Sequence, residues 1–253
     1  MTLTFTDDGH RYRLDGRTVP SVTTILNGGI PKPALIYWAA QVTAEAVADL
    51  PSTVDELRRL GRAPFVAALT AVHKQRRNEA AVRGTDVHAY AEHVVHGDTV
   101  DVPDDLVDVV SGYARWLDLF GLVPELVERP VASRTHGYAG RFDVIGTMRD
   151  GQRWLLDIKS SRGVYGDAAC QLSAYARAEF YVPADDIVET RLPDIDRIGV
   201  VHVTPSGTDL YPMGDIDQGF AEFLAAQTIY AGASRRRRLT EVPAGVPLPV
   251  VTL

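Results

Sequence analysis

The chain has 253 residues, and its 33 acidic and 26 basic side chains give a formal charge of −7. A hydrophobic content of 45% excludes a disordered chain, and the length suits one elaborated domain or two small ones. A single cysteine excludes a disulfide framework, an iron–sulfur cluster and a multi-cysteine zinc site. No apolar run reaches the roughly 18–20 residues of a membrane helix, so we expect a soluble cytoplasmic protein.

The first part of the chain has mainly helical patterns after two short strand-like segments. Residues 3–6 and 12–14 alternate between apolar and polar side chains and are separated by turn signals. Ser21 is suited to cap a short helix over residues 22–26. A break is expected near Gly84, within the third of four further helices. These helices are expected over residues 34–50, 53–60, 64–96 and 104–120.

Strand composition dominates after Pro124. Helices, three consecutive strands, a helix and a strand indicate a mixed α/β domain with an antiparallel hairpin inside its sheet. We expect a mainly helical region over residues 1–120, a core over 121–241 and an extended Pro-rich tail over 242–253, integrated in one domain. The strands are expected over residues 126–134, 138–149, 152–159, 197–204 and 209–213, and the helices over 168–181 and 216–230.

The hairpin formed by the second and third of these strands contains the most informative residues. A two-residue turn would place Asp143 and Asp157 on opposite faces of the sheet. A three-residue loop over residues 149–151 places the two carboxylates opposite each other, on one face with Lys159. Gly151 would then take the left-handed conformation that such loops favour. We expect this second register, because it also collects apolar side chains on one face: Val144, Met148, Trp154, Leu156 and Ile158.

Two facing carboxylates repel each other unless a proton or a cation lies between them. Oxygen ligands from two aspartates suit Mg²⁺ or Mn²⁺. The ammonium group of Lys159 can orient a water molecule or stabilise negative charge on a phosphorane. Phosphodiester hydrolysis requires this set of groups. A surface salt-bridge cluster across the hairpin stays open from spacing alone, because Asp-x-Lys is a common sequence.

Four motifs in a fixed order resemble the PD-(D/E)XK nuclease superfamily, and specifically its RecB-like exonuclease branch with phage-encoded members. The segment Pro20-Ser-Val-Thr-Thr-Ile-Leu26 also resembles phage members, so the likeness extends over most of residues 20–205. The four motifs are Arg83-Gly-Thr-Asp-Val-His88, Gly140-Arg-Phe-Asp143, Asp157-Ile-Lys159 and Gln171-Leu-Ser-Ala-Tyr175.

The resemblance implies a restriction-endonuclease-like α-β-β-β-α-β core, a mixed sheet flanked by helices. It implies Mg²⁺ or Mn²⁺ bound by His88, Asp143, Asp157 and the main-chain carbonyl of Ile158, with Lys159 activating water. The chain lacks the cysteines of an iron–sulfur cluster and the Walker motif of a fused helicase, so it would be a stand-alone nuclease. The implied activity is that of a DNA exonuclease that acts from DNA ends, in phage recombination, replication or repair.

The resemblance also implies catalytic roles for Gln171 and Tyr175, which lie four residues apart on one helical face. A glutamine can reach a phosphate, Lys159 or a metal-bound water, and a tyrosine can stack on a base or donate to a phosphate. Packing of this helical face on the sheet remains the alternative. Glu92 and Glu128 stay open between an added carboxylate in the cleft and a surface position.

Basic and hydroxyl side chains near these motifs are expected to contact DNA, because neutralised phosphates release counterions and strengthen binding at low salt. The alternative is a solvated charged face, which is usual for helix ends. The role of the arginine tetrad over residues 235–238 is left open. The expected DNA contacts are Lys74, Arg76, Arg77, Arg83, Arg141, Ser160 and Ser161.

Three alternatives to an exonuclease remain. They are a catalytically silent nuclease fold that binds DNA ends, a flap or structure-specific endonuclease, and a structural protein with an ion-paired hairpin. Cleavage polarity, strand preference and the number of metal ions are not determined by the sequence. A homo-oligomer also stays open, because some end-processing relatives form rings.

Overall fold

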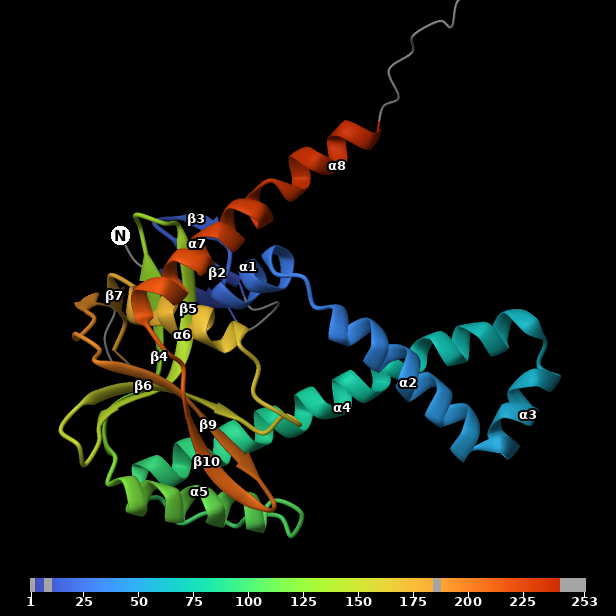
Figure 1. Ribbon diagram of the computed structural model, residues 1–253, viewed down its shortest axis with the longest axis horizontal. Coiled ribbons are helices and arrows are strands. Elements are labelled where there is room, and N and C mark those ends of the chain that lie inside the picture. The colour runs from blue at the N-terminus through green and yellow to red at the C-terminus, as the bar shows by residue number, and fades with distance from the viewer. Residues whose placement is uncertain (1–2, 7–10, 184–187, 242–253) are drawn as a thin grey trace, which may run out of the picture.

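The structure is a computed structural model that describes residues 3–6, 11–183 and 188–241 (Figure 1). The expected tail over residues 242–253 lies outside the described residues. The strands are β1 (Leu3–Thr6), β2 (Arg11–Leu14), β3 (Arg17–Val19), β4 (Val123–Ser133), β5 (Tyr138–Thr147), β6 (Arg153–Lys159), β7 (Phe180–Tyr181), β8 (Thr190–Arg191), β9 (Arg197–Thr204) and β10 (Gly207–Pro212). The helices are α1 (Val22–Gly29), α2 (Pro33–Asp49), α3 (Pro51–Arg59), α4 (Arg62–His96), α5 (Val107–Phe120), α6 (Asp167–Ala176), α7 (Ile216–Ala231) and α8 (Ala233–Glu241).

The centre of the molecule is a seven-stranded mixed sheet with the order β10-β9-β6-β5-β4-β7-β8. Strands β4, β5 and β6 are consecutive and antiparallel, and β9 runs parallel to β6. The three-stranded sheet β1-β2-β3 packs against one end of β4 and β5 through Leu3, Tyr12 and Leu14. The expected α/β class, with a mixed sheet and a helical N-terminal part, is confirmed.

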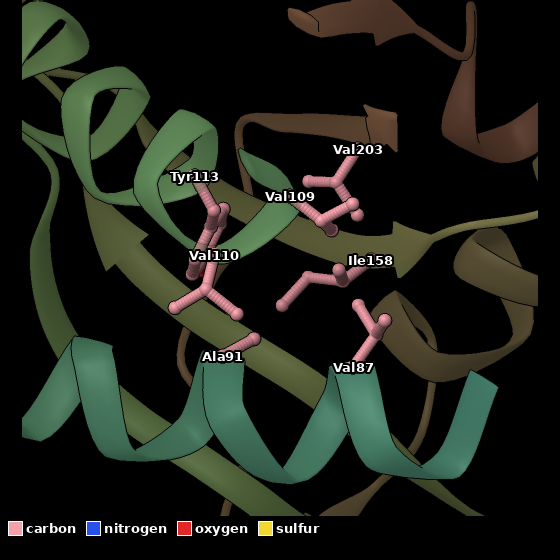
Figure 2. Close-up of a pocket in the computed structure, with 7 residues that line it drawn as sticks. All are labelled: Val87, Ala91, Val109, Val110, Tyr113, Ile158 and Val203. Atoms are coloured by element: carbon pink, nitrogen blue, oxygen red, sulfur yellow. The ribbon is translucent and has the colours of Figure 1, made fainter. Parts of the chain in front are cut away.

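Helices cover both faces of the large sheet. On one face, α1, α6 and α7 pack against side chains such as Ile145 and Leu155. On the other face, α5 and the C-terminal half of α4 pack against Val144, Leu156 and Ile158. Figure 2 shows Val87 and Ala91 of α4 pointing toward α5 and Ile158. The large sheet is therefore held between two layers of helices.

The hairpin between β5 and β6 has the expected three-residue loop. The main-chain N–H of Met148 donates to the carbonyl of Gln152 over 3.1 Å, and Gly151 has φ +76°. The pairing of Val144 with Leu156 continues the same register. The five apolar side chains expected on one face are all buried in the cluster that packs under α4 and α5.

Helices α2, α3 and the first half of α4 form an arm that projects from the sheet (Figure 1). Val42 and Val54 are the buried residues of α2 and α3, and the buried residues of α4 begin at Val87. The break expected near Gly84 is wrong, because α4 is continuous from Arg62 to His96. One glycine costs a helix only about 1 kcal/mol relative to alanine, which the flanking helix-forming residues can absorb.

Two other boundaries differ from expectation for tertiary reasons. Helix α6 ends at Ala176, not near residue 181, and Phe180 pairs with β4 as part of β7. The carboxylate of Glu179 accepts main-chain N–H groups of Arg134 and Thr135, which holds this segment against β4. The arginine tetrad, which lies beyond the last helix expected from the sequence (residues 216–230), is part of a further helix, α8. None of the described helices is both long enough and apolar enough to cross a membrane.

Candidate active site

The candidate site lies where the pairing of β5 with β6 ends. The last paired residues of this ladder are Val144 and Leu156. Beyond them, Oδ2 of Asp143 accepts a 2.6 Å hydrogen bond from the main-chain N–H of Ile158. Main-chain N–H groups of a strand point along the sheet toward the neighbouring strand. The Asp143 carboxylate therefore lies in the gap between the two strands.

This position corrects the expectation that Asp143 projects from the same face as Asp157 and Lys159. Phe142 packs in the cluster under α6, whereas Val144 packs in the cluster under α4. Residues two apart on a regular strand share a face, so the alternation of β5 shifts by one residue at Asp143. The gap between the strands is open to groups from both helical layers.

Asp157 is held from the α6 side. Its side chain is only 4% exposed, and Nζ of Lys159 lies 2.8 Å from each of its carboxylate oxygens. Nε2 of Gln171 donates to Oδ1 over 3.0 Å. Although the ammonium group is close, Oδ2 is buried and has no hydrogen-bond partner among the described residues. Asp157 thus retains one buried oxygen with unused capacity to accept.

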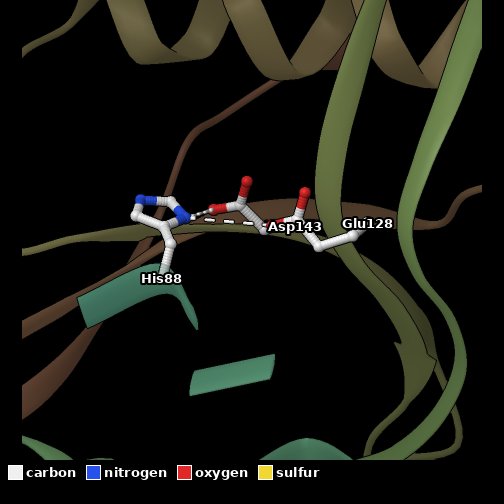
Figure 3. A group of neighbouring side chains, drawn as sticks. All are labelled: His88, Glu128 and Asp143. Carbon is white, nitrogen blue, oxygen red and sulfur yellow. Dashed lines mark ion pairs between the residues drawn. The ribbon is translucent and has the colours of Figure 1, made fainter. Parts of the chain in front are cut away.

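His88 approaches Asp143 from the α4 side. Its Nδ1 lies 3.3 Å from Oδ2 of Asp143 and 4.0 Å from Oε1 of Glu128 (Figure 3). One ligand atom from each of these three residues lies within 4.8 Å of the other two. Burial of Val87 and Ala91, on either side of His88, fixes α4 on the sheet. The imidazole and two carboxylates form a compact set of metal-binding groups.

Glu128 was left open by the sequence and is a member of this group. It stands in β4 at the position opposite Asp143, between the paired residues Val127 and Arg129. Alignment of β4 with β5 in the correct register would have placed the two acidic residues side by side. No sequence signal indicates the backbone conformation of Glu128, which has φ +50°.

The site carries an excess of negative charge. Burial raises the pKa of Asp157 to about 6, an effect that Lys159 opposes and Asp143 increases. Burial, and then Asp143, raise the pKa of Glu128 to about 8. Burial alone would lower the pKa of Lys159, but Asp157 and Asp143 outweigh it and keep that pKa above its usual value. The single ammonium group stays charged at neutral pH, and the surrounding carboxylates favour a further cation.

Helix α6 presents Gln171 to Asp157, as described, and buries Tyr175. The tyrosine is 3% exposed, and its ring fills the space above Gly140 that a Cβ would occupy. Burial raises the pKa of Tyr175, and the side chain of Gln171 opposes this rise. The tyrosine therefore packs in the core and does not reach the surface.

The groups expected to touch DNA near the hairpin have different surroundings. Arg141 is exposed, and its guanidinium group lies 5.0 Å from the centre of the Phe5 ring. Ser160 is half-buried, and Ser161 donates to the carbonyl of Gly163 over 2.8 Å. Ile158 has a buried side chain, so only its main chain is available to the site.

The four basic residues expected on α4 fall into two pairs. At about 100° per residue, Arg77 and Lys74 lie within about 20° and 40° of the direction of His88. Neither has an ion pair within the part of the chain that the structure describes. Arg76 and Arg83 point about 120° and 140° away. Arg76 pairs with Glu79 over 3.6 Å and Arg83 with Asp105 over 3.8 Å.

No protein-family model matches the chain, and no similar sequence is found among curated proteins. The function is therefore inferred from the site itself.

Proposed function

We propose that the protein is a divalent-metal-dependent deoxyribonuclease of the PD-(D/E)XK superfamily, in its RecB-like branch. The observation that carries the proposal is the meeting of three chain segments at one gap in the sheet. Strand β5 supplies Asp143, β6 supplies Asp157 and Lys159, and α4 supplies His88. Apart from the two-residue strands β7 and β8, which lie between α6 and β9, the order α5-β4-β5-β6-α6-β9 agrees with the proposed α-β-β-β-α-β core of a restriction-endonuclease-like fold.

The donor set fits Mg²⁺ or Mn²⁺, which are the proposed cofactors. An octahedral ion with ligands about 2.1 Å away holds adjacent ligands about 3.0 Å apart and opposite ligands about 4.2 Å apart. The 3.3 Å and 4.0 Å separations from Nδ1 of His88 fall within these limits. Carboxylates suit both ions, and an imidazole suits Mn²⁺ better than Mg²⁺.

A bound ion would supply charge stabilisation at the phosphate and increase the acidity of a coordinated water. Lys159 keeps its proton, because the adjacent carboxylates raise its pKa. It is therefore suited to aim a water or stabilise phosphorane charge, and poorly suited to accept a proton. Gln171 and Lys159 together fix the carboxylate of Asp157. Positioned charge of this kind contributes much of the catalysis in phosphoryl chemistry.

We propose that the DNA backbone follows α4 away from the site. Arg77 lies 11 residues before His88, or about 16 Å along the helix axis, on nearly the same face. Lys74 continues this line by a further turn. DNA strands carry one phosphate per about 3.4 Å of duplex, so the line is long enough for several phosphates. Action from DNA ends, in phage recombination, replication or repair, is the biological setting that we propose.

The proposal is tested by a cleavage time course on end-labelled linear, flapped and circular DNA with Mg²⁺, Mn²⁺ or EDTA. We expect metal-dependent cleavage by the wild type and a loss of at least about 100-fold in Asp157→Ala and Lys159→Ala. Asp209→Ala, an exposed carboxylate on β10, is the matched control and should cleave normally.

Cleavage of linear but not circular DNA would identify an exonuclease, and cleavage at flaps would identify an endonuclease. Binding to DNA ends that survives EDTA, without cleavage in Mn²⁺, would show a silent binding module. Unchanged cleavage by both site variants would overturn the proposal.

A further inference from the structure

Glu128 has a backbone conformation that is unusual for a residue inside a strand. Its φ of +50° lies in the left-handed region, which is unfavourable for a residue with a Cβ. Asp15, the other described non-glycine residue with positive φ, lies in the turn between β2 and β3. On both sides of Glu128 the pairing of β4 with β5 keeps one register, from Val127 to Arg129. Strand β4 therefore has no inserted residue at this point, and Glu128 is the residue whose backbone departs from strand geometry.

The left-handed backbone of Glu128 places its carboxylate in surroundings that disfavour a negative charge. The Glu128 side chain is only 20% exposed, and it lies beside the carboxylate of Asp143. No hydrogen bond to the Glu128 carboxylate is found within the described residues; Nδ1 of His88 lies 4.0 Å from it, and Arg141 is the cation that favours its ionised form. Backbone strain acts against this arrangement, and repulsion from Asp143 acts against the ionised form of Glu128, whose pKa is raised to about 8. A feature that is unfavourable in two ways requires a compensating interaction.

The left-handed backbone at Glu128 coincides with a shift in the alternation of side chains between the two sheet faces, in both β4 and β5. Val127 packs on the α4 side, whereas Val131 packs on the α6 side, although residues four apart on a regular strand share a face. Strand β5 shifts in the same way at Asp143. The left-handed residue Glu128 therefore lies opposite Asp143, where the shifted alternation brings the Asp143 carboxylate close to His88.

A divalent ion bound between the two carboxylates would supply this compensation. We propose that Glu128 is a protein ligand of this ion, together with His88 and Asp143, and that its left-handed backbone presents the carboxylate for this purpose. The inference rests on the proposed function for the presence of an ion, and it adds a ligand outside the four motifs. Both Lys159 and Gln171 bind Asp157, whereas one ligand atom from each of His88, Asp143 and Glu128 lies within 4.8 Å of the other two (Figure 3).

Three variants separate ligation from other roles of Glu128. Glu128→Gln removes the charge and keeps the shape, and Glu128→Gly removes the ligand and the backbone strain together. Glu92→Gln is the matched control, because Glu92 lines a recess together with His88, Glu128 and Asp143 but does not belong to the three-residue donor group. Mn²⁺ affinity is measured by calorimetry and by the spin-resonance signal of free Mn²⁺. Thermal unfolding is measured with EDTA and with Mn²⁺.

We expect Glu128→Gln and Glu128→Gly to bind Mn²⁺ at least about 10-fold more weakly than the wild type, and Glu92→Gln to stay within about twofold. In EDTA, Glu128→Gly should unfold at or above the wild-type temperature, because glycine adopts this φ without strain. It should also lose most of the stabilisation that Mn²⁺ gives the wild type.

Wild-type Mn²⁺ affinity in Glu128→Gln would overturn the assignment, and so would an equal loss in Glu92→Gln, which would indicate a general effect of charge. A clear drop in the unfolding temperature of Glu128→Gly in EDTA would overturn the role given to the backbone. If the wild type binds Mn²⁺ through Glu128 but cleaves no DNA, the nuclease proposal fails and the ligand assignment stands. If cleavage occurs while Glu128→Gln retains full affinity, only the ligand assignment fails.

Discussion

Asp143 is joined to Ile158 by a 2.6 Å hydrogen bond from the main-chain N–H of one strand to the carboxylate of the other. The acceptor oxygen is the same one that lies 3.3 Å from Nδ1 of His88. A single carboxylate thus ends the ladder between β5 and β6 and connects it to α4. Asp143 has a structural role in addition to the proposed metal-binding role, and the two can be separated by mutation.

Asp143→Ala should be less stable than Asp143→Asn by about 1–3 kcal/mol, because alanine leaves the buried N–H of Ile158 without an acceptor. Asparagine can still accept this bond and removes the repulsion with Asp157 and Glu128. Both variants should lose Mn²⁺ binding. Urea unfolding in EDTA measures the first effect and calorimetry the second. Equal stability of the two variants would show that the hydrogen bond contributes little.

Removal of Lys159 should destabilise the protein in a pH-dependent way. In the wild type, the pKa of Asp157 is raised from 3.8 to about 6, so stability falls as the pH rises through this window. Lys159→Met removes the ammonium group that limits the rise in the pKa of Asp157. The stability of this variant should therefore continue to fall above pH 6. Breaking a buried pair costs about 3–5 kcal/mol, and the partial exposure of Lys159 should keep the loss at pH 8 below that range.

Urea unfolding at pH 5 and pH 8 checks this expectation. The difference between the wild type and Lys159→Met should be larger at pH 8, where folded Asp157 is ionised in the wild type. In an Asp157→Asn background, Lys159→Met should have nearly the same effect at both values of pH. A difference that is independent of pH in both backgrounds would contradict the coupling of these two residues.

Two glycines should respond in opposite ways to substitution by alanine. A Cβ on Gly140 would overlap the buried ring of Tyr175, so Gly140→Ala should cost about 1–3 kcal/mol. Gly84 lies within α4 with open space around it, so Gly84→Ala should stabilise by about 0.5–1 kcal/mol. Thermal unfolding of both variants measures the contrast. A stable Gly140→Ala protein with wild-type cleavage would show that the tyrosine ring can move at no cost.

Regular alternation and local turn chemistry made much of the fold predictable. The helix cap at Ser21 and the loop at Gly151 depend on the residues beside them, and both were expected. The register of the hairpin followed because one residue of slip would have exposed its apolar side chains. The end of α6 was not predictable, because it is fixed by Glu179 bonding to a turn 44 and 45 residues away.

The candidate site was predictable in its residues and less so in its geometry. The motifs indicated Asp143, Asp157 and His88, but alternation placed both aspartates on one face of the sheet. The left-handed backbone at Glu128 accompanies a shift of this alternation, and nothing in the local sequence distinguishes Glu128 from a surface residue. Contacts between distant segments decide such a position, so sequence periodicity could not find it.

The two pairs of basic residues on α4 allow a test of the DNA path at constant charge. Lys74→Ala/Arg77→Ala removes two positive charges from the His88 face, and Arg76→Ala/Arg83→Ala removes two from the faces turned away. The first variant should bind DNA at least about 10-fold more weakly at low salt, and its slope of log affinity against log salt should be shallower by about 1–2. The second should retain nearly the wild-type slope, because its arginines are paired with Glu79 and Asp105. Equal losses in the two variants would show that net charge, and not a path along α4, determines the affinity.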